Sequence, residues 1–247
     1  MTIDYARSFF EFAENNVKVA GFLKTQELYF GSIYQLAQAF EKIIKSYYML
    51  MKTKVEGNSQ DDIYQHVIGI GHEIEDASLN LLIEIAEIEQ RKFKHKADNP
   101  EGSSNAGYTR LYMLLSNRVS SYIPTLEGFK NSQLEKNFLA NVQNYESFVK
   151  QKYRQYIIGA RTVEINVKAL KLMEYAASYN AIVNCIMNLY PCLYKMNDTA
   201  RYPLNSFSYR NLWYINQNNS CDNLLIMIRT LIKKYKWILE NPYVLPD

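Results

Sequence analysis

The stretch YFGSIYQLAQAFEKIIKSYYMLM, residues 29–51, decides the fold of this chain. Its apolar residues recur at steps of three and four, the period of a helix with one apolar side; they are Ile33, Leu36, Ala37, Phe40, Ile43, Ile44, Tyr47 and Met51. The opposite side carries polar residues, which are Gln35, Gln38, Glu41, Lys42, Lys45 and Lys52. Glu41 and Lys45 have the spacing of an ion pair on a helix surface. The pattern predicts a long core helix with a solvated polar side.

Helical patterns also occupy the rest of the chain, and no period-two alternation indicates a strand. A first helix capped by Thr2 should run to Gly21 or the region of Lys24. Its buried side should hold Tyr5, Phe9, Phe12, Ala13, Val17 and Ala20. After a loop at residues 54–62, a third helix begins near His72, where Gly69 and Gly71 interrupt or start it. Its core face should hold Leu79, Leu82, Ile83, Ala86 and Phe93.

The apolar pattern in the second half of the chain predicts four more helices. They cover residues 108–122, ended by Pro124; residues 132–156; residues 162–189, closed by Pro191; and residues 220–238. The fold class is therefore all-α, an antiparallel helical bundle.

Residues 98–107, DNPEGSSNAG, are the strongest linker in the chain because they combine proline, glycine, serine and asparagine. We expect the first part of a helical core at residues 1–97 and a linker or mobile loop at 98–107. Residues 108–198 would be an inserted or second helical bundle. Residues 199–247, an aromatic segment and a last helix, would pack back on the core.

The composition limits what the protein can do. The chain has 247 residues, 48% hydrophobic and 21% charged, and a net charge of +3, which is too small to indicate a nucleic-acid or membrane partner. No metal-ligand spacing joins its cysteines and histidines, so we expect no metal and no cofactor. No stretch reaches the length of a membrane helix and the amino terminus is not a secretory signal, so we expect a soluble, cytoplasmic protein.

Three fragments, taken in order, resemble the HEPN domain, an all-helical module found beside nucleotidyltransferases. They are QAFEKIIKSYY at residues 38–48, GHEIEDASLNLL at residues 71–82 and ARYP at residues 200–203. The resemblance implies an up-and-down four-helix core and a nucleotide-binding or protein-interaction role. Residues 98–198 make the chain much longer than a minimal HEPN module. Nucleotide-binding positions implied in this way are Glu41, Lys42, Lys45, His72, Arg201 and Tyr202.

Ribonucleases of that family carry an arginine and a histidine separated by four to six residues. Here Arg91 and His95 are separated by only three, so the motif is missing and we expect no catalysis. An alternative is a divergent, metal-independent ribonuclease of the toxin or defence type. In it Arg91 would stabilise phosphorane charge and His95 or His72 would move a proton. A basic, solvated helix end explains Arg91 and His95 equally, and a structural role at a helix start explains His72.

The function expected from the sequence is thus a non-catalytic nucleotide-binding or interaction module. It would act as a homodimer through exposed helix faces, with a nucleotidyltransferase as candidate partner. Basic patches such as residues 92–96 could give salt-sensitive contact with RNA. A helical scaffold without any ligand is the third alternative.

Overall fold

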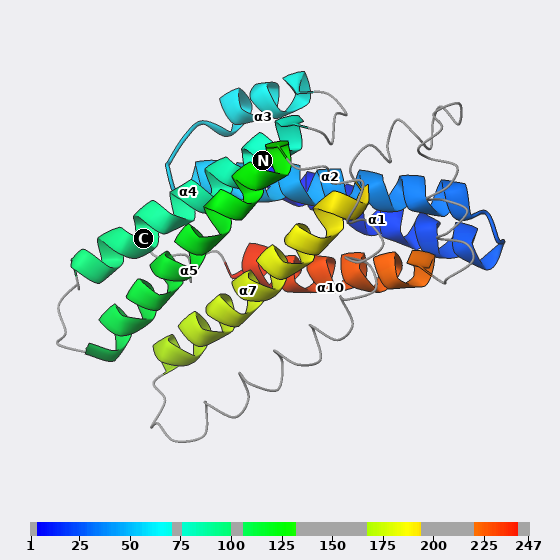
Figure 1. Cartoon of the computed structure of the whole chain (residues 1–247). Coiled ribbons are helices and arrows are strands. Elements are labelled where there is room, and N and C mark those ends of the chain that lie inside the picture. Colours follow the sequence, from blue (N-terminus) through cyan, green and yellow to red (C-terminus); the bar gives the residue numbers. More distant parts are fainter. Residues whose placement is uncertain (1–3, 71–75, 100–105, 132–166, 194–219, 242–247) are drawn as a thin grey trace.

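The computed structural model describes residues 4–70, 76–99, 106–131, 167–193 and 220–241, which form helices and no strand (Figure 1). The all-α class is therefore confirmed. The described helices are α1 (Tyr5–Thr25), α2 (Tyr29–Lys54), α3 (Gln60–Gly69), α4 (Asp76–Asp98), α5 (Ala106–Asn131), α7 (Val167–Leu193) and α10 (Ser220–Glu240). None of them combines the length and the apolarity that crossing a bilayer requires.

Helices α1 and α2 form an antiparallel hairpin joined by residues 26–28. Two buried serines of α2 hold it together, because each donates its hydroxyl to a carbonyl of α1. Ser32 donates to Ala20 at 2.9 Å and Ser46 donates to Ala6 at 2.6 Å. These small polar residues let the two backbones approach closely along the whole length of the hairpin.

Helix α2 lies at the centre of the molecule, with α1, α3, α4 and α10 packed against it. Figure 1 shows α1, α2 and α10 running across the molecule, while α4, α5 and α7 form a second group with a common slant. One hydrophobic core contains side chains from all seven described helices. The predicted domain boundaries and the four-helix HEPN arrangement stay predictions.

The first helix differs from its prediction at its start and on its buried side. Its N-cap is Asp4, whose carboxylate accepts a hydrogen bond from the Arg7 amide at 3.1 Å, whereas Thr2 lies outside the described residues. Phe12, predicted to be buried, is exposed. The core side of α1 is narrow, since Ala13, Val17 and Ala20 already fill it against α2, and Phe12 falls outside this strip.

Two further helix ends were predicted wrongly, and the predicted interruption near Gly69 separates two helices. Helix α5 continues through Pro124 to Asn131, because a proline in a helix removes one hydrogen bond and the buried Leu126 still holds the next turn in the core. Helix α7 likewise passes Pro191 and ends at Leu193, which is buried. The region around Gly69 holds two helices, α3 and α4.

The five core residues predicted for α4 are all buried. The helix expected at residues 132–156 lies outside the described residues.

Candidate functional site

The polar residues on one side of α2 form a row of hydrogen bonds. Lys45 Nζ lies 2.7 Å from Glu41 Oε1, one helical turn away. Gln38 connects the row further, because its amide group donates to Glu41 Oε2 at 3.5 Å and accepts from Lys42 Nζ at 3.1 Å. We call these four residues, Gln38, Glu41, Lys42 and Lys45, the polar stripe of α2.

The polar stripe is not solvated, which corrects the prediction for this side of the helix. Glu41 is 1% exposed and Lys45 is 3% exposed, and Gln38 is also buried. The ion pair itself was predicted correctly from its spacing. Because the pair is buried, each charge needs the other: either one alone would lose its hydration without compensation. Nucleotide binding by Glu41, Lys42 and Lys45 stays a prediction; among them only Lys42 is partly exposed.

The same side of α2 ends in an open pocket of about 270 Å³ between α2 and α3. From α2 it receives Tyr48 and Lys52, which follow the polar stripe at steps of three and four. The residues contributed by α3 and the loop before it are Asn58, Ser59, Asp62, Ile63 and His66. We call this space the α2–α3 pocket.

Its wall combines an aromatic ring, an imidazole and a cation. The rings of Tyr48 and His66 have centres 6.0 Å apart, and Lys52 Nζ lies 5.5 Å from the centre of the Tyr48 ring. Ser59 precedes α3, and its side chain makes no capping hydrogen bond to the first amides of that helix. Those amides carry the positive end of the helix dipole.

A network of charges fixes the lysine behind the pocket. Lys52 Nζ lies 3.0 Å from Glu56 and 3.3 Å from Glu84, and Tyr48 donates its hydroxyl to Glu84 at 3.0 Å. Partial burial lowers the pKa of Lys52, but the hydrogen bonds with both carboxylates outweigh it, so the pKa is raised. Burial raises the pKa of Glu56, but the hydrogen bonds and charges of Lys52 and Arg91 together outweigh burial, so this pKa is lowered. The ammonium of Lys52 therefore stays charged.

The catalytic candidates of the ribonuclease alternative are bound to other partners. The guanidinium of Arg91 lies 2.8 Å from Glu56, and His95 Nδ1 lies 3.0 Å from the amide nitrogen of Asn99. Both Arg91 and His95 are exposed on α4, and neither lines the α2–α3 pocket. The other predicted site residues, His72, Arg201 and Tyr202, lie outside the described residues. In the described ranges, no three His, Cys, Asp or Glu side chains are grouped so that they could hold a metal ion.

A second polar cluster lies inside the core around Glu89 of α4. Tyr47 of α2 donates its hydroxyl to Glu89 Oε1, and Tyr175 of α7 donates to the same oxygen at 2.9 Å. The second oxygen, Oε2, is buried without a hydrogen-bond partner in the part of the chain that the structure describes. The cluster joins three helices at one carboxyl group.

Burial raises the pKa of Glu89 to about 7, although hydrogen bonds from Tyr47, Tyr179 and Tyr175 oppose the shift. The charged carboxylate loses its hydration inside the core, and three hydroxyl groups replace that hydration only in part. The pKa values of Tyr47 and Tyr175 are raised as well, first by burial and then by the nearby Glu89. A buried group with a pKa near neutral pH is a candidate for function. Burial in a core alone can also raise a pKa in this way.

Sequence reasoning missed Glu89, although its spacing contains the signal. Glu89 follows Leu82 by seven residues and Ala86 by three, and it precedes Phe93 by four. Those three residues were assigned to the core face of the helix, so the same periodicity places Glu89 on that face. Its partners Tyr47 and Tyr175 could not be paired with it from the sequence, because they come from distant helices.

Comparison of the chain with models of known protein families, with curated proteins and with solved structures gives no match. The resemblance to the HEPN domain therefore stays a prediction carried by the residues alone.

Proposed function

We propose that the protein is a non-catalytic, HEPN-like helical module that binds a nucleotide in the α2–α3 pocket. The observation that carries the proposal is the open pocket of about 270 Å³ with an imidazole, a tyrosine ring and a fixed ammonium in its wall. This volume is close to the lower end of ligand pockets, about 300 Å³, and suits a mononucleotide better than a larger cofactor. The homodimer and the nucleotidyltransferase partner expected from the sequence belong to the same proposal.

The chemistry of the wall matches the parts of a nucleotide. The exposed imidazole of His66 offers a face on which a base can stack. Asp62 can accept a hydrogen bond from a ribose hydroxyl or a base amino group. The phosphate would lie at the first amides of α3 beside Lys52, in competition with Glu56 and Glu84 for that ammonium.

Calorimetric titration of the purified protein with AMP, ATP, GTP and UMP tests the proposal. We expect His66→Ala to weaken binding about fivefold or more, because it removes a stacking surface worth about 1 kcal/mol or more. His95→Ala is the matched control, since it makes the same change at another exposed helical histidine outside the pocket, and it should leave affinity unchanged. Equal affinities of the two variants, or no binding of any of the four nucleotides, would reject the pocket as the site.

The ribonuclease alternative is tested separately with a mixed RNA pool and no added metal. We expect intact RNA with the wild-type protein, His95→Ala and His72→Ala, because Arg91 and His95 are engaged with Glu56 and Asn99. Cleavage by the wild type that disappears in either variant would replace a binding module with an enzyme. Intact RNA together with no nucleotide binding would favour the scaffold alternative.

A further inference from the structure

Helix α1 presents a second apolar row on the side away from the core. Phe12 is 60% exposed, Val19 is 43% exposed and Phe22 is 64% exposed. Asn15 lies between Phe12 and Val19 in this row. The four positions 12, 15, 19 and 22 are separated by three, four and three residues, which is the a/d spacing of a coiled-coil seam. We call these four residues the α1 seam.

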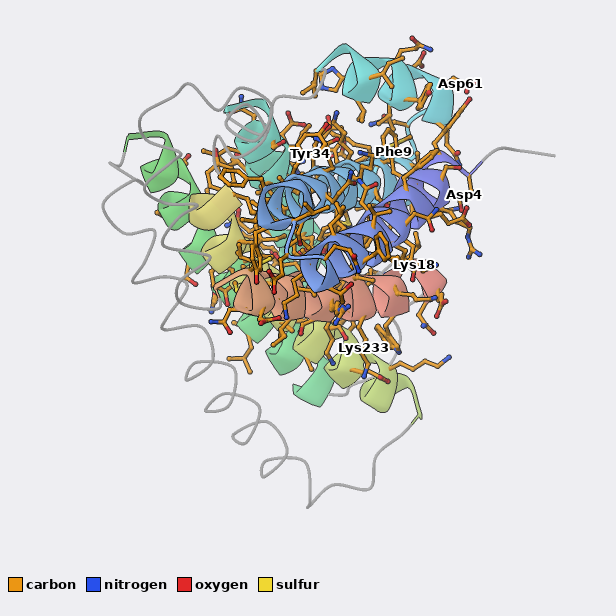
Figure 2. All side chains as sticks on the ribbon, turned by 90° about the vertical axis from the view of Figure 1, so that its right-hand side faces the viewer. Asp4, Phe9, Lys18, Tyr34, Asp61 and Lys233 are labelled. Atoms are coloured by element: carbon orange, nitrogen blue, oxygen red, sulfur yellow. The ribbon has the colours of Figure 1, made fainter. Side chains whose placement is uncertain are left out.

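The α1 seam is a different surface from the one that packs on α2. Ala13, Val17 and Ala20 face the core, and the seam residues follow a separate line along the helix. Figure 2 shows α1, with Phe9 and Lys18 labelled, between α3 and α10 in that view. Two phenylalanines this exposed on one helix are unusual for a surface that stays in water.

We propose that the α1 seam pairs with the α1 seam of a second copy of this chain, antiparallel and about a two-fold axis between residues 15 and 16. In such a pairing, residues at equal distances on either side of the axis face each other. Phe12 then meets Val19 of the second copy, and the two-fold axis repeats this contact with the two copies exchanged. The apolar centre of the seam, Phe12 and Val19 of each copy, is therefore covered by apolar side chains of the other copy.

Charges beside the seam select a second copy as the occupant and fix its direction. Glu11 and Lys18 lie seven residues apart on the same flank, and neither forms an ion pair in the described part of the chain. Antiparallel pairing brings each Glu11 beside Lys18 of the second copy, offset by two residues or about 3 Å along the helix. Parallel pairing would instead place this flank of the two helices on opposite sides of the interface, so Glu11 of one copy could not reach Lys18 of the other. The seam is therefore self-complementary in one direction only.

This inference deepens the homodimer part of the proposed function and does not depend on nucleotide binding. Sedimentation equilibrium of the full chain should show a monomer–dimer equilibrium at micromolar concentration. Phe12→Glu combined with Phe22→Glu should weaken the dimer by at least about tenfold, because it places charges in an apolar seam. Leu114→Glu is the matched control, since Leu114 is similarly exposed on α5, and should leave the equilibrium unchanged. Circular dichroism of both variants checks that they remain folded.

The charged flank gives a test that a general apolar surface would fail. Glu11→Lys should weaken the dimer about tenfold, since it creates like-charge contacts at both ends of the seam. The exchange Glu11→Lys with Lys18→Glu should restore it. Asn15→Cys should form a disulfide-linked dimer under mild oxidation because residue 15 lies at the axis, whereas Val19→Cys should not.

A monomer at all concentrations would overturn both the inference and the homodimer part of the proposed function, even if the seam then captured another protein. A dimer that is insensitive to the seam variants would overturn only the inference. Cross-linking through Val19→Cys would show parallel pairing, which sets each residue level with its own counterpart, and would also overturn the inference.

Discussion

At the scale of single residues, two buried acids of this protein are stabilised in different ways. Glu41 has a lysine partner on its own helix, so its charge is balanced within one turn. Glu89 has tyrosine hydroxyls from two other helices and no cation among its described partners. The first arrangement depends on both charges being present, whereas the second depends on pH.

Removing one partner of the Glu41–Lys45 pair should destabilise the protein strongly. We expect Lys45→Met to lower the free energy of unfolding by about 3–5 kcal/mol, because it leaves a buried carboxylate without its ammonium. Urea unfolding measures this loss, and Lys233→Met, at an exposed lysine of α10, is the control and should change it by less than about 0.5 kcal/mol. The double variant Glu41→Gln with Lys45→Met should lose clearly less than both single losses added together. Additive losses would mean that the two side chains do not act as a pair.

Glu89 should make the protein less stable as the pH rises toward neutrality. Its pKa is raised to about 7 in the folded state by burial, so between about pH 4.5 and 7 the folded protein holds a proton that the unfolded chain releases. The contribution is fully present below the lower value and is lost as the pH rises through the upper one, amounting to about 3 kcal/mol.

Urea unfolding of Glu89→Gln from pH 4 to 8 measures this contribution. The difference from the wild type should change with pH over that window, since glutamine has no proton to lose. Glu87→Gln on the same helix is the control, and its pH profile should follow the wild type. Parallel profiles for all three proteins would show that Glu89 does not titrate in this range.

At the scale of elements, the surroundings of two glycines indicate whether alanine there would stabilise or destabilise the protein. Gly21 lies inside α1, and a methyl group there would meet only the guanidinium of Arg229, at 3.1 Å. The Arg229 side chain is exposed and flexible, so it can move away. Gly57 in the α2–α3 loop differs, because its φ of +71° is a conformation that other residues adopt with strain.

The two glycines should therefore respond in opposite directions to the same change. We expect Gly21→Ala to raise the free energy of unfolding by about 0.5–1 kcal/mol through the better helix propensity of alanine. Gly57→Ala should lower it by about 1 kcal/mol through backbone strain. Thermal unfolding of both variants measures the two effects. A loss of stability in Gly21→Ala would mean that Arg229 is held in place and that α10 restricts α1 more tightly than its exposed position indicates.

At the scale of the whole molecule, α2 is the element that the other helices share. It packs against α1, α3, α4 and α10, and nearly all its residues from Ser32 to Met51 are buried. Helix α3 lies at the other extreme, since it is short and buries only Ile63 and Val67. Such differences in burial set how easily each segment opens by itself.

Native-state hydrogen exchange should reflect this arrangement. We expect the amides in the middle of α2 to exchange only by global unfolding, as the slowest in the protein. Amides of α3 should exchange much faster through local opening, and a bound nucleotide should slow them if the α2–α3 pocket is the site. Mass spectrometry of peptides from both helices measures the rates. Equal protection of α2 and α3 would contradict this order.

The sequence by itself determined the helical class, the start of α2 and the core residues of α4, because a period of three to four apolar residues is a local property of the chain. Local spacing also predicted the Glu41–Lys45 pair. The burial of that pair, the exposure of Phe12 and the continuation of α5 through Pro124 were decided only by the tertiary structure. Each depends on which neighbouring helix covers a given side, and a neighbour distant in sequence leaves no periodic signal. For the same reason Glu89 could be placed on a core face from the sequence, whereas its tyrosines from α2 and α7 could not.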